Sequence, residues 1–339
     1  MDTGKSHGWG FIGASDIART AMIPAIRSQS HNFVKAVMSS NLERAKQYAL
    51  ETDIPAAYDS VEALLADPDI AIVYISTTNE LHHSQTLAAA KAGKHVLCEK
   101  PLTMSIEAAN EMVKACRDAG VVMGINHHLR NAAAHRTMRR MIAEGKIGQP
   151  LAARVFHAVY LPPRLQGWRL HKPEAGGGVI LDITVHDTDT LRFVLNDDVE
   201  SVTAFSLQQG LASGAVEDAV MGVMRFRSGL LAQFHDAFTI KHAGTGFQVH
   251  GTEGSLFAEG VMQPNPPGKV FLHCDGKVEE VDTGEHEDVY MIGVRNFVQA
   301  VEGQGSPSAT GEDGLHSLAV ALAAQESART GASVRVRYR

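Results

Sequence analysis

The first third of the chain alternates short apolar runs with helical patterns, and this alternation limits the possible folds more than any other feature. The runs are continuous rather than alternating, which is typical of parallel strands buried on both faces. Two of the helical segments end at Gly93 and Gly120, and Ser105 is a suitable cap for the last one. We therefore expect a parallel sheet covered by helices. The expected strands are Trp9–Ile12, Phe33–Met38, Ile70–Ile75, His95–Leu97 and Val121–Gly124, and the expected helices are Leu42–Leu50, Leu81–Ala92 and Ile106–Ala119.

The pattern changes after Gly124. From Leu151 onward the chain reads as short strands joined by clusters of turn residues, which predicts a mostly antiparallel sheet. We expect an α/β protein with two domains, residues 1–126 and residues 127–339, the second built around an open, mostly antiparallel sheet. Its expected strands are Ala152–Val159, Val202–Leu207, Ala219–Phe226, Leu230–Phe238, Phe247–His250 and Val270–His273, and its expected helices are Ala132–Glu144, Val289–Glu302 and Gly314–Ala328.

Composition narrows the classes of protein to which the chain can belong. Its 339 residues carry a net charge of −7 with basic residues spread along the chain, which argues against nucleic acid as the main partner. No apolar run approaches the length of a membrane span, and the first residues lack the pattern of a signal peptide. Three cysteines without CxxC spacing suit a reducing compartment. We expect a cytoplasmic protein that binds a small molecule, and the sequence leaves open whether it forms a homo-oligomer.

A glycine-containing turn directly follows the first expected strand. It runs from Gly13 to Ala18 with the pattern G-x-S-x-x-A. Gly13 permits a tight turn, Ser15 is small enough to let the backbone approach a pyrophosphate, and Ala18 allows a helix to pack closely on the strand. An ordinary strand–helix turn is the alternative, but the alternating units behind it favour a dinucleotide-binding site at the helix N-terminus. The candidate contacts here are Gly13, Ser15, Ile17 and Ala18.

The end of the second strand indicates which dinucleotide is bound. An enzyme specific for NAD usually has a carboxylate there to hold the ribose 2′-hydroxyl. Here the stretch is Ser39-Ser40-Asn41, followed by Arg44, so that hydroxyls and a guanidinium can bind a 2′-phosphate instead. Glu43 stands one helical step further on, and Glu43 and Arg44 can also be read as exposed helix residues. We expect NADP(H) as the cofactor, with Ser39, Ser40 and Arg44 as contacts.

Two further segments lie at the carboxyl ends of expected strands, where ligands bind in open α/β sheets. Ser76-Thr77-Thr78-Asn79 follows the third strand, and its side chains can hydrogen-bond ribose or nicotinamide, although Asn79 can equally cap the next helix. Glu99-Lys100-Pro101 follows the fourth strand, and a lysine there can polarise a substrate carbonyl. An exposed loop lysine is the alternative. The candidate cofactor contacts in these segments and beyond are Ser76, Thr77, Thr78, Asn79, Glu99, Lys100 and Asn126.

A second candidate for chemistry lies in the second domain. Asp182 and His186 are four residues apart, so on a helix they share one face, where a carboxylate can orient an imidazole and raise its pKa. A histidine so placed suits a proton donor to a developing alkoxide. The alternative is a carboxylate at a helix start and a partly buried histidine. Aromatic and guanidinium groups before this helix can line a polyol pocket or form a plain structural loop, and with His186 they are the candidate substrate contacts: Tyr160, Arg164, Trp168 and Arg169.

The sequence contains 17 histidines, so a metal site has to be considered. His82-His83 and His127-His128 are adjacent pairs, and neighbouring residues on a strand point to opposite faces. No H-E-x-x-H or cysteine-rich spacing accompanies them. We expect no metal ion, and hydride transfer needs none.

The order of these motifs resembles the glucose–fructose oxidoreductase / inositol dehydrogenase (Gfo/Idh/MocA) family. It is carried by G-x-S-x-x-A at Gly13–Ala18, by Glu99-Lys100-Pro101, and by Asp182-x-x-x-His186. The resemblance implies a Rossmann domain followed by an α/β domain with an open, mostly antiparallel sheet, and NAD(P)-linked oxidation or reduction of sugars and related polyols. It also implies that Lys100, Asp182 and His186 form the catalytic group.

Longer segments give a closer likeness within the family, to bacterial NADPH-dependent reductases of a sugar ketone. They are Trp9–Ser15, Asn126–Asn131, Phe156–Pro163 and Leu165–Leu170, whereas residues 260–288 match poorly. The likeness implies 2′-phosphate contacts at Ser39 and Arg44. Two other functions stay open: an NAD(P)-dependent sugar or inositol dehydrogenase of the same family, and a non-catalytic NAD(P)-binding regulator, against which Lys100 and His186 argue.

Overall fold

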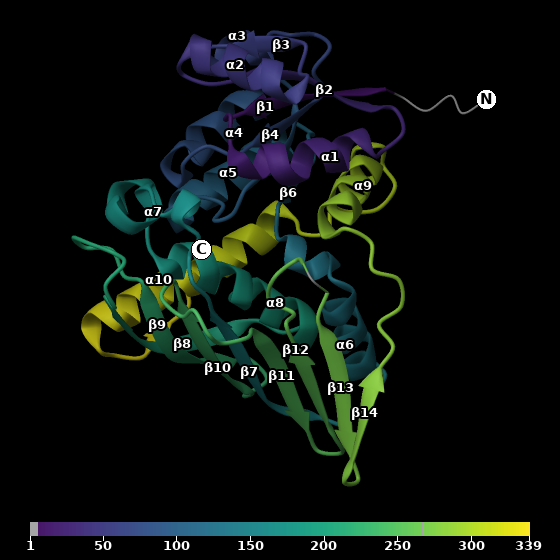
Figure 1. Cartoon of the computed structure of the whole chain (residues 1–339), viewed down its shortest axis with the longest axis vertical. Coiled ribbons are helices and arrows are strands. Elements are labelled where there is room, and N and C mark those ends of the chain that lie inside the picture. The colour runs from purple at the N-terminus through teal and green to yellow at the C-terminus, as the bar shows by residue number, and fades with distance from the viewer. Residues whose placement is uncertain (1–5, 266) are drawn as a thin grey trace. The chain divides into compact units, whose positions relative to one another are not determined.

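The computed structural model describes residues 6–265 and 267–339, which divide into two compact units (Figure 1). The first contains the described residues up to His127 together with Asp288–Leu315, and the second contains His128–Glu287 and His316–Arg339. The sequence predicts one uninterrupted domain over residues 127–339, whereas in the structure Asp288–Leu315 joins the first unit. Gly124 gives a physical reason, because a Cβ atom there would lie 2.9 Å from the Phe297 ring. The missing side chain lets Phe297 pack against strand β6.

The first unit is built on a six-stranded parallel sheet in the order β3-β2-β1-β4-β5-β6. Its strands are β1 His7–Ile12, β2 Asn32–Met38, β3 Ala56–Tyr58, β4 Ile72–Ile75, β5 His95–Cys98 and β6 Met123–Ile125. All four residues of β4 are fully buried, as expected for a strand covered on both faces. This strand order is that of a doubly wound dinucleotide-binding sheet, with its crevice at the carboxyl ends of β1 and β4.

Helices of the first unit begin and end close to the expected residues. Ser105 caps α5, because its Oγ accepts the Ala108 N–H at 3.2 Å. Asn41 caps α2 in the same way, accepting the Arg44 N–H at 2.9 Å. The helical segments are η1 Ala18–Met22, α1 Ile23–Arg27, α2 Leu42–Thr52, α3 Val61–Leu65, η2 Asn79–Leu81, α4 His82–Lys91, α5 Ile106–Asp118 and α9 Val289–Val301; α10, Gly311–Thr330, begins in this unit and continues in the second.

The second unit is built on a nine-stranded sheet in the order β14-β13-β12-β11-β7-β10-β9-β8-β15. Every neighbouring pair is antiparallel except β7 and β10, which run parallel. The expected α/β fold with an open, mostly antiparallel second sheet is thus confirmed. The strands are β7 Pro150–Ala158, β8 Val199–Leu207, β9 Ala219–Phe226, β10 Leu231–Ala237, β11 Gly246–Gly251, β12 Ser255–Glu259, β13 Lys269–Cys274, β14 Lys277–Val281 and β15 Val334–Arg335.

Helix α8, Val185–Leu195, contacts β7 and continues from a π-helical turn, η6 Ile180–Thr184. Its neighbour α6, Ala133–Ala143, packs against it. Five short helical turns complete this unit: η3 His128–Asn131, η4 Pro163–Leu165, α7 Trp168–His171 and η5 Pro173–Ala175, together with η6. Most side chains of α8 are buried, so this helix, which carries His186, is part of the core of the unit.

Candidate active site

The turn after β1 can be formed only by a glycine at position 13. Gly13 has φ +113°, and a Cβ atom there would lie 3.0 Å from the Ser76 carbonyl oxygen and 3.1 Å from the Thr77 nitrogen. The backbone of the β1 turn therefore lies directly against the turn that follows β4. This close approach of two strand ends forms the floor on which a dinucleotide sits in folds of this type, so that the residues present fit such a cofactor.

Ser15 connects the same two turns through its side chain. Its Oγ donates to Ser76 Oγ at 2.8 Å and accepts the Ala18 N–H at 3.2 Å, which caps the following helix. Ala18 is fully buried, as close helix–strand packing requires, and Ile17 stands at the N-cap of η1. The N–H groups of the first helical turn thus begin at the carboxyl edge of the sheet, where they favour an anion.

The end of β2 carries hydroxyls and a guanidinium. Ser39 is buried, with its N–H donated to the Tyr58 carbonyl at 3.2 Å, and Ser40 is exposed. Arg44 Nη2 donates to the Ala14 carbonyl at 3.0 Å, so the guanidinium lies at the glycine turn. Glu43 instead pairs with Lys46 at 2.9 Å on the exposed side of α2. The end of β2 thus carries hydroxyls with a guanidinium close by, and the Glu43 carboxylate is held on the exposed side of α2.

The loop after β4 holds the next group of expected residues. Thr77 Oγ1 donates to Gln85 Oε1 at 2.7 Å, and Thr78 Oγ1 donates to Glu80 Oε1 at 2.7 Å, so both hydroxyls are engaged with the helix that follows. Asn79 is buried at the start of η2. These contacts fix the loop at the carboxyl edge of the sheet, beside the turn containing Gly13.

Glu99 joins the ends of β4, β5 and β6. Its Oε1 accepts the Tyr74 hydroxyl at 2.5 Å and Asn126 Nδ2 at 2.6 Å. Burial and the Glu99 charge together raise the pKa of Tyr74, which keeps this phenol protonated and donating. The half-buried Lys100 follows, and its peptide bond to Pro101 is cis. The first unit thus brings all the expected cofactor contacts to one edge of its sheet.

In the second unit, three glycines allow the loop before η6 to fold back on the helix start. A Cβ at Gly177 would lie within 3.0 Å of the carbonyl oxygens of Lys172, Trp168 and Arg169. Gly178 has φ +113°, and a Cβ there would lie 2.3 Å from Glu217 Oε1. Glu217 accepts the Ile180 N–H at 3.1 Å, which satisfies one donor at the helix start. The glycines bring α7, with Trp168 and Arg169, against the helix that carries Asp182.

Asp182 and His186 stand on one continuous helix, with Asp182 in η6 and His186 in α8. Arg169 Nε donates to Asp182 Oδ1 at 3.4 Å, and the Arg169 guanidinium lies 4.7 Å from the centre of the Trp168 ring. His186 is 8% exposed and meets the edge of the His128 ring at 5.0 Å between ring centres. The His186 imidazole is therefore buried and packs against a second ring, which limits its movement as a positioned acid requires.

The other expected substrate contacts lie on the loop between β7 and η6. Tyr160 is half-buried beneath Lys241, whose Nζ lies 4.6 Å from the ring centre. Arg164 is exposed on η4. The sequence predicts no role for His128 in the site, although this residue lies in an adjacent histidine pair and in the segment Asn126–Asn131. Its ring nevertheless packs against His186. That contact depends on the fold of η3 and has no signal in the spacing of residues.

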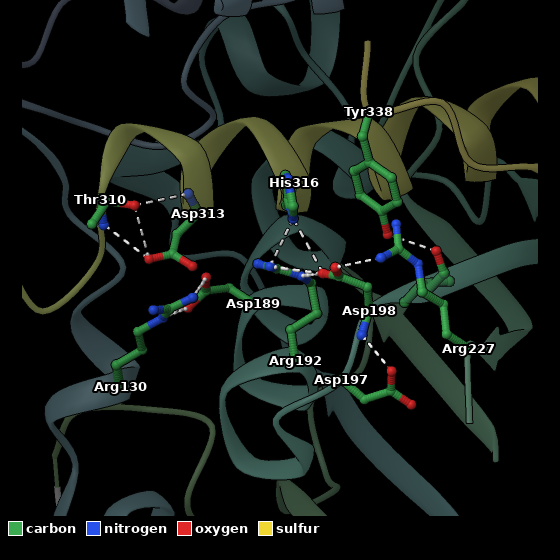
Figure 2. Close-up of polar contacts among 11 residues, drawn as sticks. Arg130, Asp189, Arg192, Asp197, Asp198, Arg227, Thr310, Asp313, His316 and Tyr338 are labelled. Atoms are coloured by element: carbon green, nitrogen blue, oxygen red, sulfur yellow. Dashed lines mark hydrogen bonds and ion pairs between the residues drawn. The ribbon is translucent and has the colours of Figure 1, made fainter. Parts of the chain in front are cut away.

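One buried and several partly buried ion pairs hold the rest of α8 in place (Figure 2). Arg130 donates from Nε and Nη2 to the two oxygens of Asp189, each at 2.7 Å. At the other end, Arg192 Nε donates to Asp198 at 2.9 Å, and His316 lies 3.1 Å from the same carboxylate. Burial opposes ionisation of Asp198, but the charges and hydrogen bonds of Arg192 and His316 together outweigh it and hold the pKa of Asp198 below its usual range. Such pairing makes α8 a rigid support.

Within residues 6–265 and 267–339, no group of three or more His, Cys, Asp or Glu side chains is placed to hold a metal ion. In the same residues, no helix combines the length and the apolar character that crossing a membrane requires.

Comparison with known proteins places the chain in a family. A family model described as an oxidoreductase family with an NAD-binding Rossmann fold matches residues 7–127, and a model of the GFO/IDH/MocA C-terminal domain matches residues 135–257. The chain belongs to the Gfo/Idh/MocA oxidoreductase family. The expected family and the expected class of enzyme, an oxidoreductase, are thereby confirmed, and the first unit is the NAD-binding Rossmann fold of this family.

Several relatives cover nearly the whole chain. The 1,5-anhydro-D-fructose reductase of Ensifer adhaerens is 59% identical over 97% of this chain and 98% of its own length. A D-xylose 1-dehydrogenase (NADP(+)) of Haloferax volcanii is 30% identical over 96% of this chain and 98% of its own. Among solved structures, an aldose–aldose oxidoreductase from Caulobacter crescentus has the same fold, with a TM-score of 0.89 at 24% identity over 98% of this chain and 100% of its own.

Proposed function

We propose that this protein reduces a sugar ketone with NADPH, and that its substrate is 1,5-anhydro-D-fructose, reduced at C2 to 1,5-anhydro-D-mannitol. One observation carries the proposal: a relative of that activity shares 59% of its residues over 97% of the chain. The family Gfo/Idh/MocA also contains dehydrogenases that are more distant from this chain. The segments that suggested a reductase from sequence lie around Gly13, around His128 and before η6.

The choice of NADPH over NADH rests on the end of β2. Arg44 lies against the glycine turn and Ser39 is buried beside it, whereas Glu43 is engaged by Lys46. A guanidinium stabilises a phosphate more than a hydroxyl, so a 2′-phosphate gains more from this site than a free ribose does. The proposed cofactor contacts are Gly13, Ser15, Ile17, Ala18, Ser39, Ser40, Arg44, Ser76, Thr77, Thr78, Asn79, Glu99, Lys100 and Asn126.

We assign the chemistry to Lys100, Asp182 and His186. The bound reduced nicotinamide supplies the hydride, so the protein has to stabilise and protonate the oxygen that becomes negative. His186 donates that proton, because an imidazole titrates near neutral pH and this one is held by packing. Lys100 stabilises the developing charge as a fixed cation. Asp182 supports the imidazolium form of His186, and Arg169 holds the Asp182 carboxylate.

The substrate is a polyol, and the loop before η6 offers groups that suit one. Tyr160, Arg164, Trp168 and Arg169 present a phenol, an indole and two guanidinium groups from one short stretch of chain. An aromatic face packs on the C–H surface of a sugar, and guanidinium groups donate to its hydroxyls.

The buried thiols of Cys98 and Cys116 are free, which favours a protein that works in the cytoplasm.

An assay with purified protein tests the proposal. The protein is incubated with NADPH or NADH and 1,5-anhydro-D-fructose, and with NADP⁺ or NAD⁺ and a panel of aldoses and inositols, while the absorbance of the reduced nicotinamide is followed. We expect oxidation of NADPH with 1,5-anhydro-D-fructose and a lower kcat/KM with NADH. Turnover confined to an aldose or an inositol in the oxidative direction would make the chain a dehydrogenase, and binding without turnover would make it a regulator.

A further inference from the structure

Four polar side chains are buried together where the start of α8 meets the nine-stranded sheet. His157 of β7 and Asp236 of β10 are register partners on neighbouring strands, so they lie side by side on the buried face. Thr184 of η6 and Asp187 of α8 meet them there. Asp187, Asp236 and Thr184 are fully buried, and His157 is 7% exposed. Two carboxyl groups are therefore removed from water at the same point.

One oxygen of each carboxyl group forms a hydrogen bond with a neighbouring side chain. Asp187 Oδ1 lies 2.8 Å from His157 Nδ1, and Asp236 Oδ2 accepts the Thr184 hydroxyl at 2.5 Å. The second oxygens, Asp187 Oδ2 and Asp236 Oδ1, are buried and receive no N–H or hydroxyl donor from the described part of the chain. Both of these oxygens belong to the same buried cluster, because Asp187 contacts His157 and Asp236 is the register partner of His157. Since an ionised carboxylate only accepts, a hydrogen bond between the two groups would require a proton on one of them.

We propose that Asp187 and Asp236 share one proton, donated by Asp236 to Asp187, and that this pair positions the first turn of α8, which carries His186. Asp187 is the better anion, because the His157 imidazole can donate to it, whereas the partner of Asp236 is a neutral hydroxyl. With this proton, a continuous series of hydrogen bonds links Thr184, Asp236, Asp187 and His157. These hydrogen bonds hold η6 and α8 against β10 and β7. The positioning role rests on the proposed function of His186.

The surroundings favour the singly protonated pair. Burial raises the pKa of Asp236 well above its usual range, and burial also raises the pKa of Asp187, so the pair keeps a proton at neutral pH. The other titratable groups nearby are His157 on β7 and, further off, His135 on α6 and Asp189 on α8. Asp189 is neutralised by Arg130. Two buried negative charges in contact would repel each other, so loss of the proton would loosen the start of α8.

Asparagine substitutions test the proton directly. In Asp236→Asn, the amide oxygen can accept from Thr184 while the amide N–H donates to Asp187, as the proposed proton does. In Asp187→Asn, the amide N–H can donate to an ionised Asp236. The double variant sets two N–H₂ groups against each other, and neither can accept. Asp275→Asn is the matched control, because Asp275 is exposed in the β13–β14 turn at φ +51°, a conformation that Asn also adopts.

The first readout is chemical unfolding at a series of pH values. The folded wild type holds one proton that the unfolded chain loses above the ordinary pKa of Asp, so the pair stabilises less as pH rises. The ratio of the unfolding constant of Asp236→Asn to that of wild type should therefore fall about tenfold for each pH unit between about pH 5 and pH 7. Taking the ratio cancels the opposite contribution of buried histidines such as His135. Asp275→Asn should give a flat ratio, and a flat ratio for Asp236→Asn overturns the shared proton.

The second readout combines kcat, NADPH affinity and the NMR titration of His186 in each variant. We expect each single variant to keep kcat within about threefold, and the double variant to lose at least about tenfold in kcat with NADPH affinity unchanged. The NMR titration of His186 should be unaltered in the single variants and shifted in the double variant. Single variants that lose kcat as strongly as the double variant overturn the positioning role. If the wild type reduces no sugar, the proposed function fails. The unfolding ratios and the His186 titration still test whether Asp187 and Asp236 share a proton and position His186.

Discussion

Replacing Ser39 by Asp should reverse the coenzyme preference, since Ser39 stands where NAD-specific folds place a ribose-binding carboxylate. The new charge repels a 2′-phosphate. At an effective dielectric constant of about 20, two unit charges about 8 Å apart interact by ~2 kcal/mol. That energy corresponds to roughly 30-fold weaker binding of NADPH. The same carboxylate can accept the ribose 2′-hydroxyl of NADH, a charged hydrogen bond of about 1.5 kcal/mol, so NADH should bind roughly tenfold more tightly.

Fluorescence titration of NADPH and NADH against each purified variant measures both effects. Ser39→Asn is the matched control, because it adds nearly the same volume to this buried position without the charge. It should change the two affinities alike. A shift in preference as large in Ser39→Asn as in Ser39→Asp would show that size, and not charge, decides the coenzyme. Wild-type protein that binds NADH more tightly than NADPH would refute the reasoning as a whole.

Four further predictions follow from single features of the structure. Arg44→Ala should weaken NADPH by about 10- to 100-fold in the same titration and leave NADH nearly unchanged, whereas Lys46→Ala, which removes a charge from the exposed side of α2, should change neither. Gly178→Ala should lower the free energy of unfolding by about 2 kcal/mol or more, measured by denaturant, because φ +113° and Glu217 both oppose a Cβ; an unchanged midpoint contradicts this. Burial lowers the pKa of His135 to about 4, so its contribution to stability is present above about pH 6.5 and is lost as pH falls toward 4; His135→Leu should lack this part of the acid slope. Incubation with EDTA should leave turnover intact, and loss restored by one divalent ion would contradict the reading of the histidines.

The Rossmann strands were predictable because burial on both faces leaves continuous apolar runs in the sequence. Where that signal is weak, elements were missed. β3 has three half-buried residues, Ala56–Tyr58, and β14 is the charged stretch Lys277–Val281. Neither strand therefore shows the pattern of apolar residues that marks a strand in a sequence. β12, Ser255–Glu259, was not predicted either. Such strands owe their pairing to neighbours in the sheet, which sequence alone does not supply.

The candidate site also contains residues that the sequence predicts and contacts that it does not. Gly13 and Ser15 could be predicted, since the backbone approach that they permit leaves a local pattern. The contact of Arg44 with the Ala14 carbonyl and that of His128 with His186 depend on how distant segments pack. The buried pair Asp187 and Asp236 had no signal either, because nothing in a strand or helix pattern shows that two carboxyl groups will face each other.

The proton donor is the central claim, and one paired measurement tests it most directly: NADPH affinity by fluorescence and turnover of 1,5-anhydro-D-fructose, both on wild type, His186→Ala and Lys100→Ala. We expect each variant to lose about 10²-fold or more in kcat, the usual scale for a positioned acid, while NADPH binds as in wild type. Turnover at the wild-type rate in the His186 variant would place the proton donor elsewhere. Loss of NADPH binding instead of turnover would assign these residues to the cofactor and not to the chemistry.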